Sequence, residues 1–180
     1  MSPRTVKLHD CEFSTYICEE EIIARISMLA EQLDKDYEHK NPLFLAVLNG
    51  SFMFAADLMK RVNIPSEISF IRLSSYQDMQ STGKVKEILG LSEDIRGRHV
   101  VVLEDIVDTG HTVHGLLQQL QERGPASVEV ATLLLKPECL QHPLDVKYVA
   151  RSIPNDFVVG YGLDYNGQGR NLRDIYKIVS

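Results

Sequence analysis

The chain has 180 residues, of which 44% are hydrophobic and 24% are charged, and its formal net charge is −6. This length and composition are typical of one globular domain with a full core, and they exclude a disordered chain. The acidic balance gives no broad cationic field, so we expect no nucleic-acid partner. The N-terminus shows no signal-peptide pattern and no long apolar span follows it, so we expect a cytoplasmic protein without a membrane contact.

The cysteines and histidines do not form a strong metal-binding pattern. Three cysteines are too few and too scattered for a disulfide framework. Cys139 with His142, and His111 with His114, each supply only two possible ligands, so we interpret these residues as surface positions rather than a zinc site.

The N-terminal part predicts an arm and then a helix. Residues 1–17 show mixed polarity and no sustained period, which indicates an arm with one short strand. Three glutamates at 19–21 suit the positive end of a helix. Its apolar stripe consists of Ile22, Ile26, Leu29, Leu33 and Tyr37.

The next segment predicts a buried strand followed by a helix. Residues 43–48 are continuously apolar, which is typical of a strand buried on both faces of a parallel sheet. The turn Asn49-Gly50-Ser51 leads into a helix expected from Phe52 to about Arg61. Free N–H groups at a helix start attract anions, so this turn is a candidate anion site.

Residues 68–73 predict a third strand, and the segment that follows it predicts a loop. Residues 74–84 are polar, contain glycine and lack an apolar period. Their composition alone fits an idle surface loop as well as a functional one.

The stretch 98–120 carries the strongest signal of the chain. Residues 100–103 form an apolar, β-branched run that predicts a central strand, ended by Glu104 and Asp105. The turn from Asp108 to Thr112 then opens a helix whose apolar residues recur at 113, 116, 117 and 120. Small and hydroxylated residues at a helix start can bind a phosphate.

The acids beside this turn indicate what else the site binds. Carboxylates would repel a bare phosphate, so sugar hydroxyls, a divalent cation or both should lie between them and the phosphate. A phosphorylated sugar is the ligand that fits best. The plain alternative is an ordinary strand-helix turn whose acids cap the helix.

The C-terminal third predicts one more long strand and several short ones. Residues 128–135 read as a strand that ends at Lys136, which by pattern alone is most often a solvated strand end. Shorter strands are expected within 146–153, 157–160 and 175–179. Phe157 is either a core residue or a stacking partner for a flat base.

Strands that alternate with helices predict an α/β fold. We expect a single domain over residues 1–180, built on a doubly wound, mainly parallel sheet with helices on both faces. Such sheets bind ligands beyond the carboxyl ends of their strands, and the 49–51 turn, the acids at 104–108 and Lys136 all fall at that edge.

Two segments resemble a known family. Residues 103–112, LEDIVDTGHT, resemble the phosphoribosyl pyrophosphate signature of type I phosphoribosyltransferases. The sequence of this segment is most similar to that of the hypoxanthine-guanine phosphoribosyltransferases. Residues 153–165, IPNDFVVGYGLDY, resemble the base-binding segment of that family. The likeness, which covers about 43–178, implies a small hood subdomain built from the N-terminal arm and the C-terminal part.

The resemblance implies purine salvage, in which the 5-phosphoribosyl group of phosphoribosyl pyrophosphate is transferred to hypoxanthine or guanine with Mg²⁺. The products would be IMP or GMP and pyrophosphate. Asp108 matches the catalytic proton acceptor. The residues implied to bind phosphoribosyl pyrophosphate are Leu48, Asn49, Gly50, Ser75, Tyr76, Glu104, Asp105, Asp108, Thr109, Gly110, His111, Thr112 and Arg170.

Further details of that site follow from the same resemblance. Glu104 and Asp105 would hold the ribose hydroxyls, and the 74–84 loop would be a lid. A strained non-proline peptide often follows the leucine at position 48. Many relatives carry a basic residue where this chain has Asn49.

The resemblance also assigns a purine site and a metal site. Lys136 would contact the 6-oxo group and Phe157 would stack on the base. The full purine set is Ile106, Lys136, Phe157, Val158, Leu163 and Asp164, and magnesium would lie near Glu104, Asp105 and Asp164. We expect a homodimer or homotetramer. A regulator that has this fold, senses phosphoribosyl pyrophosphate and binds nucleic acid or protein is the alternative, which the acidic charge and the intact Asp108 and Lys136 disfavour.

Overall fold

The computed structural model describes residues 4–74 and 87–179, which form two sheets of six and four strands. Within those ranges, no helix combines the length and apolar character needed to cross a bilayer.

The six-stranded sheet is mainly parallel and has the order β5-β4-β3-β6-β7-β8. Its parallel strands are β3 (Leu43–Leu48), β4 (Glu67–Ser74), β6 (His99–Val107), β7 (Ser127–Leu135) and β8 (Tyr148–Ser152). At one edge, β5 (Glu87–Leu89) pairs antiparallel with β4. A 3₁₀ turn, Pro137–Cys139, follows β7.

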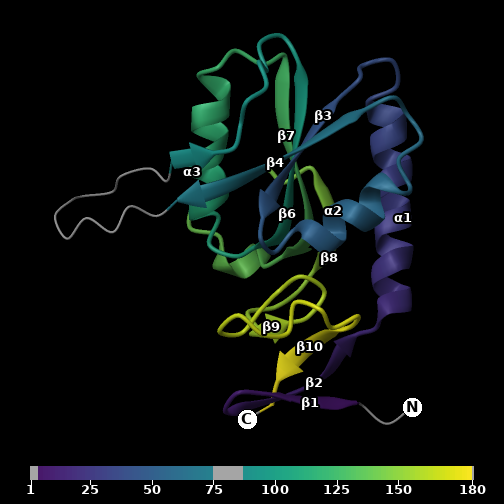
Figure 1. Ribbon diagram of the computed structural model, residues 1–180, viewed down its shortest axis with the longest axis vertical. Helices are drawn as coiled ribbons and strands as arrows, with labels where there is room; N and C mark the ends of the chain where they lie inside the picture. The colour runs from purple at the N-terminus through teal and green to yellow at the C-terminus, as the bar shows by residue number, and fades with distance from the viewer. Residues whose placement is uncertain (1–3, 75–86, 180) are drawn as a thin grey trace, which may run out of the picture.

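Helices cover both faces of this sheet (Figure 1). On one face, α1 (Glu19–Asp36) and α2 (Phe52–Met59) pack against alternate strand residues such as Phe44 and Val101. On the other face, α3 (His111–Gln121) packs against the intervening residues, such as Leu45 and Val102. Continuous apolar strands are needed because both faces are buried. The predicted doubly wound α/β sheet is therefore confirmed.

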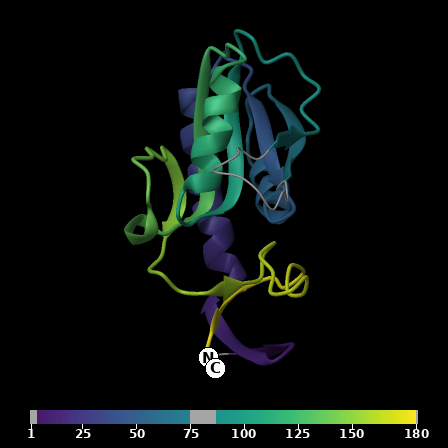
Figure 2. The same ribbon diagram turned by 90° about the vertical axis from the view of Figure 1, so that its left-hand side faces the viewer.

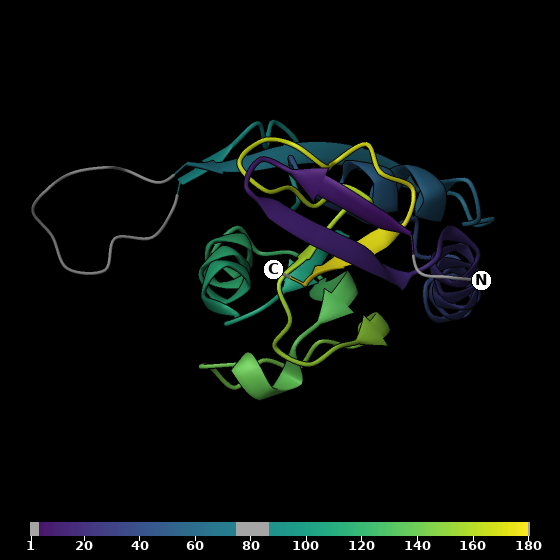
Figure 3. The same cartoon turned by 90° about the horizontal axis from the view of Figure 1, so that it is seen from below.

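The hood is an antiparallel sheet at one end of the molecule, with the order β1-β2-β10-β9. It joins β1 (Thr5–Leu8) and β2 (Cys11–Ile17) to β9 (Val158–Val159) and β10 (Ile175–Ile178). Figures 1 and 2 place it beyond the large sheet, and Figure 3 shows its strands in front of the sheet when the molecule is seen from below. Phe13, Val159 and Tyr176 form its own small core.

Some local predictions differ from the structure. The N-terminal arm has two strands rather than one, because β10, from the other end of the chain, supplies a partner for β2. The acids at 104 and 105 lie within β6 rather than after it. Pairing with β3 ends at Leu103, but pairing with β7 continues to Val107, so β6 remains extended past the acids. The antiparallel strand β5 was not predicted.

Candidate active site

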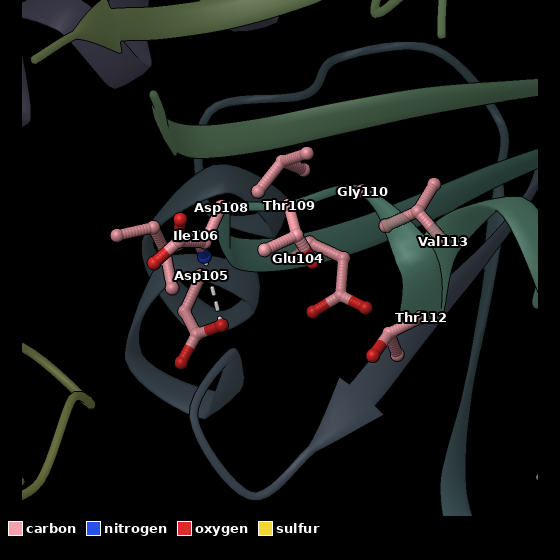
Figure 4. Close-up of a pocket in the computed structure, with 9 residues that line it drawn as sticks. Glu104, Asp105, Ile106, Asp108, Thr109, Gly110, Thr112 and Val113 are labelled. Carbon is pink, nitrogen blue, oxygen red and sulfur yellow. Dashed lines mark hydrogen bonds between the residues drawn. The ribbon is translucent and has the colours of Figure 1, made fainter. Parts of the chain in front are cut away.

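The turn between β6 and α3 encloses a pocket of about 240 Å³, lined by residues 104–110, 112 and 113. Glu104, Asp105 and Thr112 project to the same side of this turn (Figure 4). Gly110 has φ = +80°, a conformation that glycine adopts without strain, and α3 begins at the next residue. The pocket therefore combines a helix start with carboxylates, the combination that predicted a phosphorylated sugar.

Asp105 is the point where the pocket meets the 49–51 turn. Its Oδ1 accepts a hydrogen bond from the Ile106 N–H at 2.8 Å. A Cβ atom added to Gly50 would lie 1.6 Å from Asp105 Oδ2, so the carboxylate occupies the space that a side chain at 50 would need. Burial raises the pKa of Asp105 above its ordinary value, against the effect of the Ile106 hydrogen bond.

The hood approaches the 49–51 turn closely at Gly162. A Cβ atom there would lie 2.1 Å from the carbonyl oxygen of Gly50, and φ is +99°. Arg170 fixes this approach, because its Nη1 donates to the Gly162 carbonyl at 2.7 Å and its Nη2 lies 2.7 Å from Asp164 Oδ1. The other oxygen of Asp164 accepts the Gly167 N–H at 2.7 Å. The structure thus brings Gly50, Asp105, Asp164 and Arg170 together.

A second cluster forms around Lys136 at the end of β7. Its ammonium is buried, lies 2.9 Å from Asp108 Oδ2 and donates to Asn155 Oδ1 at 3.4 Å. The Asp108 side chain is 48% exposed, so the carboxylate remains open to a ligand. Cys139 also contacts Asp108, and its thiol pKa is raised by burial and then by the charge of Asp108.

An aromatic group in the hood carries the predicted stacking residue. Phe157 is 46% exposed, and its ring lies 6.2 Å from that of Phe13 and 5.8 Å from that of Tyr165. Val158 and Leu163 are buried, and Ile106 is half-buried. An exposed face backed by two rings can receive a flat base.

Three histidines meet at the start of α3, beside the turn from Asp108 to Thr112. The ring nitrogens His142 Nε2 and His111 Nδ1 lie 2.6 Å apart, and the ring of His114 stacks on that of His142 at 4.7 Å. His111 Nε2 also lies 2.7 Å from Gln141 Oε1. Burial, followed by the charges of His111 and His114, lowers the pKa of His142. The sequence indicated only pairs, because the fold brings position 142 to the start of α3.

The other predicted site residues fall in or beside these clusters. Thr109 is half-buried in the pocket lining, and the peptide between Leu48 and Asn49 is cis, at the position that the resemblance indicated. Ser75 and Tyr76, with residues 75–84 of the predicted lid, lie outside the described residues, whereas Ser74 is the last residue of β4 rather than the first of the loop.

Two residues of the site were not predicted from the sequence. They are Asn155, which contacts Lys136, and Arg72, which donates to Asn49 Oδ1 at 2.9 Å. Asn155 lies inside the 153–165 segment, so that segment was the available signal for it. Arg72 could be found only from the strand register, which pairs it with Leu48.

The carboxylates of the site are also possible ligands for a metal ion. Among the residues that the structure describes, there is no group of three or more His, Cys, Asp or Glu side chains arranged to hold one. Mg²⁺ commonly uses only one or two protein carboxylates and takes its other ligands from substrate phosphates and water. Glu104 and Asp105 are hard oxygen donors, and Asp164 is near enough to raise the pKa of Asp105 further, so this donor set fits Mg²⁺.

Comparisons with known proteins agree with this geometry. The phosphoribosyl transferase domain family matches residues 16–166. The hypoxanthine phosphoribosyltransferase of Buchnera aphidicola subsp. Schizaphis graminum is 44% identical over 166 residues, which are 91% of this chain and 94% of that protein. The hypoxanthine-guanine phosphoribosyltransferase of Streptococcus pneumoniae is 43% identical over 157 residues, which are 87% of each chain.

A solved structure supports the same relationship. It belongs to a study of the role of the C-terminal region in the oligomeric state and enzymatic activity of Trypanosoma cruzi hypoxanthine phosphoribosyl transferase. Its TM-score is 0.86 at 37% identity, and the match covers 97% of this chain and 95% of that one.

Proposed function

Since the chain belongs to the phosphoribosyl transferase domain family, we propose that it is a purine salvage enzyme that makes IMP or GMP from phosphoribosyl pyrophosphate and hypoxanthine or guanine. The observation that supports this substrate choice best is the buried Lys136 beside the half-exposed Asp108, next to the acidic turn. A cation and a proton acceptor are the two groups that a 6-oxopurine needs along one edge.

We propose the following roles for the phosphoribosyl group. Its 5′-phosphate accepts hydrogen bonds from the 109–112 turn at the start of α3, where backbone N–H groups and threonine hydroxyls are available. Glu104 and Asp105 accept hydrogen bonds from the ribose hydroxyls. As the bond to pyrophosphate breaks, the ribose gains oxocarbenium character, and these carboxylates stabilise its positive charge.

For the base, the proposed roles follow from hydrogen-bond chemistry. Lys136 donates to the 6-oxo group, Phe157 stacks on the ring and the backbone of Val158 faces the edge of the base. Asp108 accepts the proton from N7 while N9 attacks the ribose. The hydrogen bond from Lys136 to Asp108 supports these roles, because it holds the donor and the acceptor side by side.

Magnesium is part of the proposal. Glu104, Asp105 and Asp164 are the residues that would hold it, with the phosphates of the substrate. The ion would neutralise charge on the departing pyrophosphate. Arg170, which contacts Asp164, would serve the same leaving group.

We also propose that the enzyme is a homodimer or homotetramer. Ile68 and Phe70 lie on one face of β4 and are 38% and 45% exposed, and adjacent exposed apolar side chains commonly mark a contact surface. Sedimentation velocity would measure the assembly. We further propose that the core and the hood form one domain over residues 1–180. The proposed location of the enzyme is the cytoplasm.

One assay tests the function directly. Conversion of hypoxanthine to IMP is followed spectrophotometrically with phosphoribosyl pyrophosphate, with and without magnesium. Turnover that needs all three components supports an enzyme. Binding of phosphoribosyl pyrophosphate without turnover would instead support the regulator with the same fold.

A further inference from the structure

Arg72 lies beside the 49–51 turn although it comes from another strand. In the parallel register of β3 and β4, Leu48 is paired with Arg72, which places both at the carboxyl end of the sheet. The guanidinium Nη2 of Arg72 donates to Asn49 Oδ1 at 2.9 Å. This contact attaches a cation to a turn, Asn49-Gly50-Ser51, that carries no charged side chain of its own.

The other cations at this edge already have anionic partners. Lys136 is buried against Asp108 at 2.9 Å, and Arg170 is 2.7 Å from Asp164. Arg72 is exposed, and within residues 4–74 and 87–179 its side chain has no acidic partner. Its charge is therefore available to a ligand, while those of Lys136 and Arg170 are largely offset within the protein.

The hydrogen bond also determines what Asn49 can offer. Because its carbonyl oxygen accepts from Arg72, the N–H groups of the same amide remain as donors. Arg72 has further N–H groups in a planar fork, which suits phosphate oxygens. Together the two side chains present donors only, and an anion is the ligand that such a surface recognises.

We propose that Arg72, held by Asn49, binds the pyrophosphate of phosphoribosyl pyrophosphate and supplies the positive charge of the 49–51 turn. This assignment rests on the proposed function, because that reaction releases pyrophosphate. It makes Arg72 a binding residue for the leaving group, whereas the 109–112 turn holds the 5′-phosphate of the ribose at a separate place.

The test measures binding rather than turnover, with inorganic pyrophosphate and magnesium titrated into the protein in a calorimeter. Arg72→Ala should weaken pyrophosphate binding about tenfold to a hundredfold, since hydrogen bonds between charged groups are among the strongest. Binding of IMP, which has no pyrophosphate, should change less than about twofold. Arg72→Gln, which keeps a polar N–H donor but is shorter and uncharged, should behave like Arg72→Ala and serves if the alanine variant folds poorly.

A matched control and a rescue complete the experiment. Arg98 pairs with Glu67 near the amino end of β4, so Arg98→Ala removes the same charge from the opposite edge of the sheet and should leave pyrophosphate binding unchanged. Asn49→Lys in the Arg72→Ala background restores a cation to the turn and should recover most of the lost affinity.

Three results would overturn the role of Arg72. They are unchanged pyrophosphate binding by Arg72→Ala and Arg72→Gln, an equal loss of IMP binding, or an equal loss in Arg98→Ala. The native protein also separates this proposal from the proposed function. Lack of hypoxanthine turnover alongside Arg72-dependent pyrophosphate binding would reject the enzyme and keep the site.

Discussion

At the scale of single residues, the pair of Asp108 and Lys136 is where base chemistry should occur. The two side chains come from the ends of neighbouring parallel strands, β6 and β7, and meet at 2.9 Å. Both residues could be predicted from the sequence, because each follows an apolar strand and each matches the family. Their contact with each other could not be predicted, since it depends on the strand order.

Replacing Asp108 with Asn keeps the shape of the side chain but removes its proton affinity. We expect kcat to fall by ~10²–10⁴ in the hypoxanthine assay, because general-base catalysis is lost. Asp94→Asn is the control, since Asp94 accepts a backbone hydrogen bond from Arg96 and does not line the pocket. A loss below about tenfold in a normally folded protein would remove Asp108 from the role of proton acceptor.

Lys136 should determine which purines are used. An ammonium only donates hydrogen bonds, so it suits the 6-oxo group of hypoxanthine and guanine but not the amino group of adenine. A buried unpaired group is costly, so we expect kcat/KM for adenine to be lower by ~10⁴ or more. Lys136→Ala should lower the hypoxanthine value, whereas Lys147→Ala, which removes a lysine paired with Asp36, should not. Equal use of adenine by the native protein would contradict this role.

At the scale of elements, the site depends on how closely the 49–51 turn approaches β6. Gly50→Ala places a Cβ atom 1.6 Å from Asp105 Oδ2, so the carboxylate must move. A displacement of about 1 Å at a reacting centre can cost about 10²-fold, and we expect a loss of that order in kcat/KM for phosphoribosyl pyrophosphate.

Gly97→Ala separates this effect from general destabilisation. Gly97 has φ = +70° and no atom within 4 Å of an added Cβ, so the substitution strains the backbone at a position outside the pocket. It should lower the free energy of unfolding but leave kcat/KM unchanged. If Gly50→Ala retained the native kcat/KM, the close approach of Gly50 to Asp105 would not be needed for activity.

The elements that could be predicted are those whose pattern is local. The runs in β3, β6 and β7 are continuous because both faces of those strands are buried, and the stripe of α1 repeats at helical spacing. The length of β6 beyond Leu103 and the strand β5 depend on pairing partners, which the sequence does not reveal. For the same reason, the position of Arg72 beside the 49–51 turn could not be predicted, because it follows from the strand register with Leu48.

At the scale of the whole molecule, the hood must stay docked on the core for the site to be complete. Arg170 and Asp164 lie in the segment between β9 and β10, and they reach Gly50 through Gly162. Two further hydrogen bonds join the two parts. Glu19 N donates to Asp174 Oδ1 at 2.8 Å, and the Tyr161 hydroxyl donates to Asp57 on α2.

Asp57 makes the last of these contacts sensitive to pH. Burial alone would raise its pKa, but hydrogen bonds from Lys60 and Tyr161 outweigh burial, so the pKa of Asp57 lies below its ordinary value. A carboxyl group with a lowered pKa in the folded state contributes stability above its unfolded-state pKa. That contribution is lost as the pH falls through the folded-state value.

Tyr161→Phe removes the hydroxyl and keeps the ring, so it isolates this docking contact. We expect the free energy of unfolding to fall by about 1 kcal/mol at pH 7, as measured by urea denaturation. The difference between native and variant should shrink below about pH 4, because protonation of Asp57 weakens the same contact in the native protein. Tyr16→Phe is the matched control, because the Tyr16 hydroxyl makes no hydrogen bond with the described residues and the substitution should cost little at either pH. A Tyr161→Phe loss of equal size at both pH values would mean that the charge on the Asp57 carboxylate contributes nothing to the stabilising effect of the Tyr161 hydroxyl.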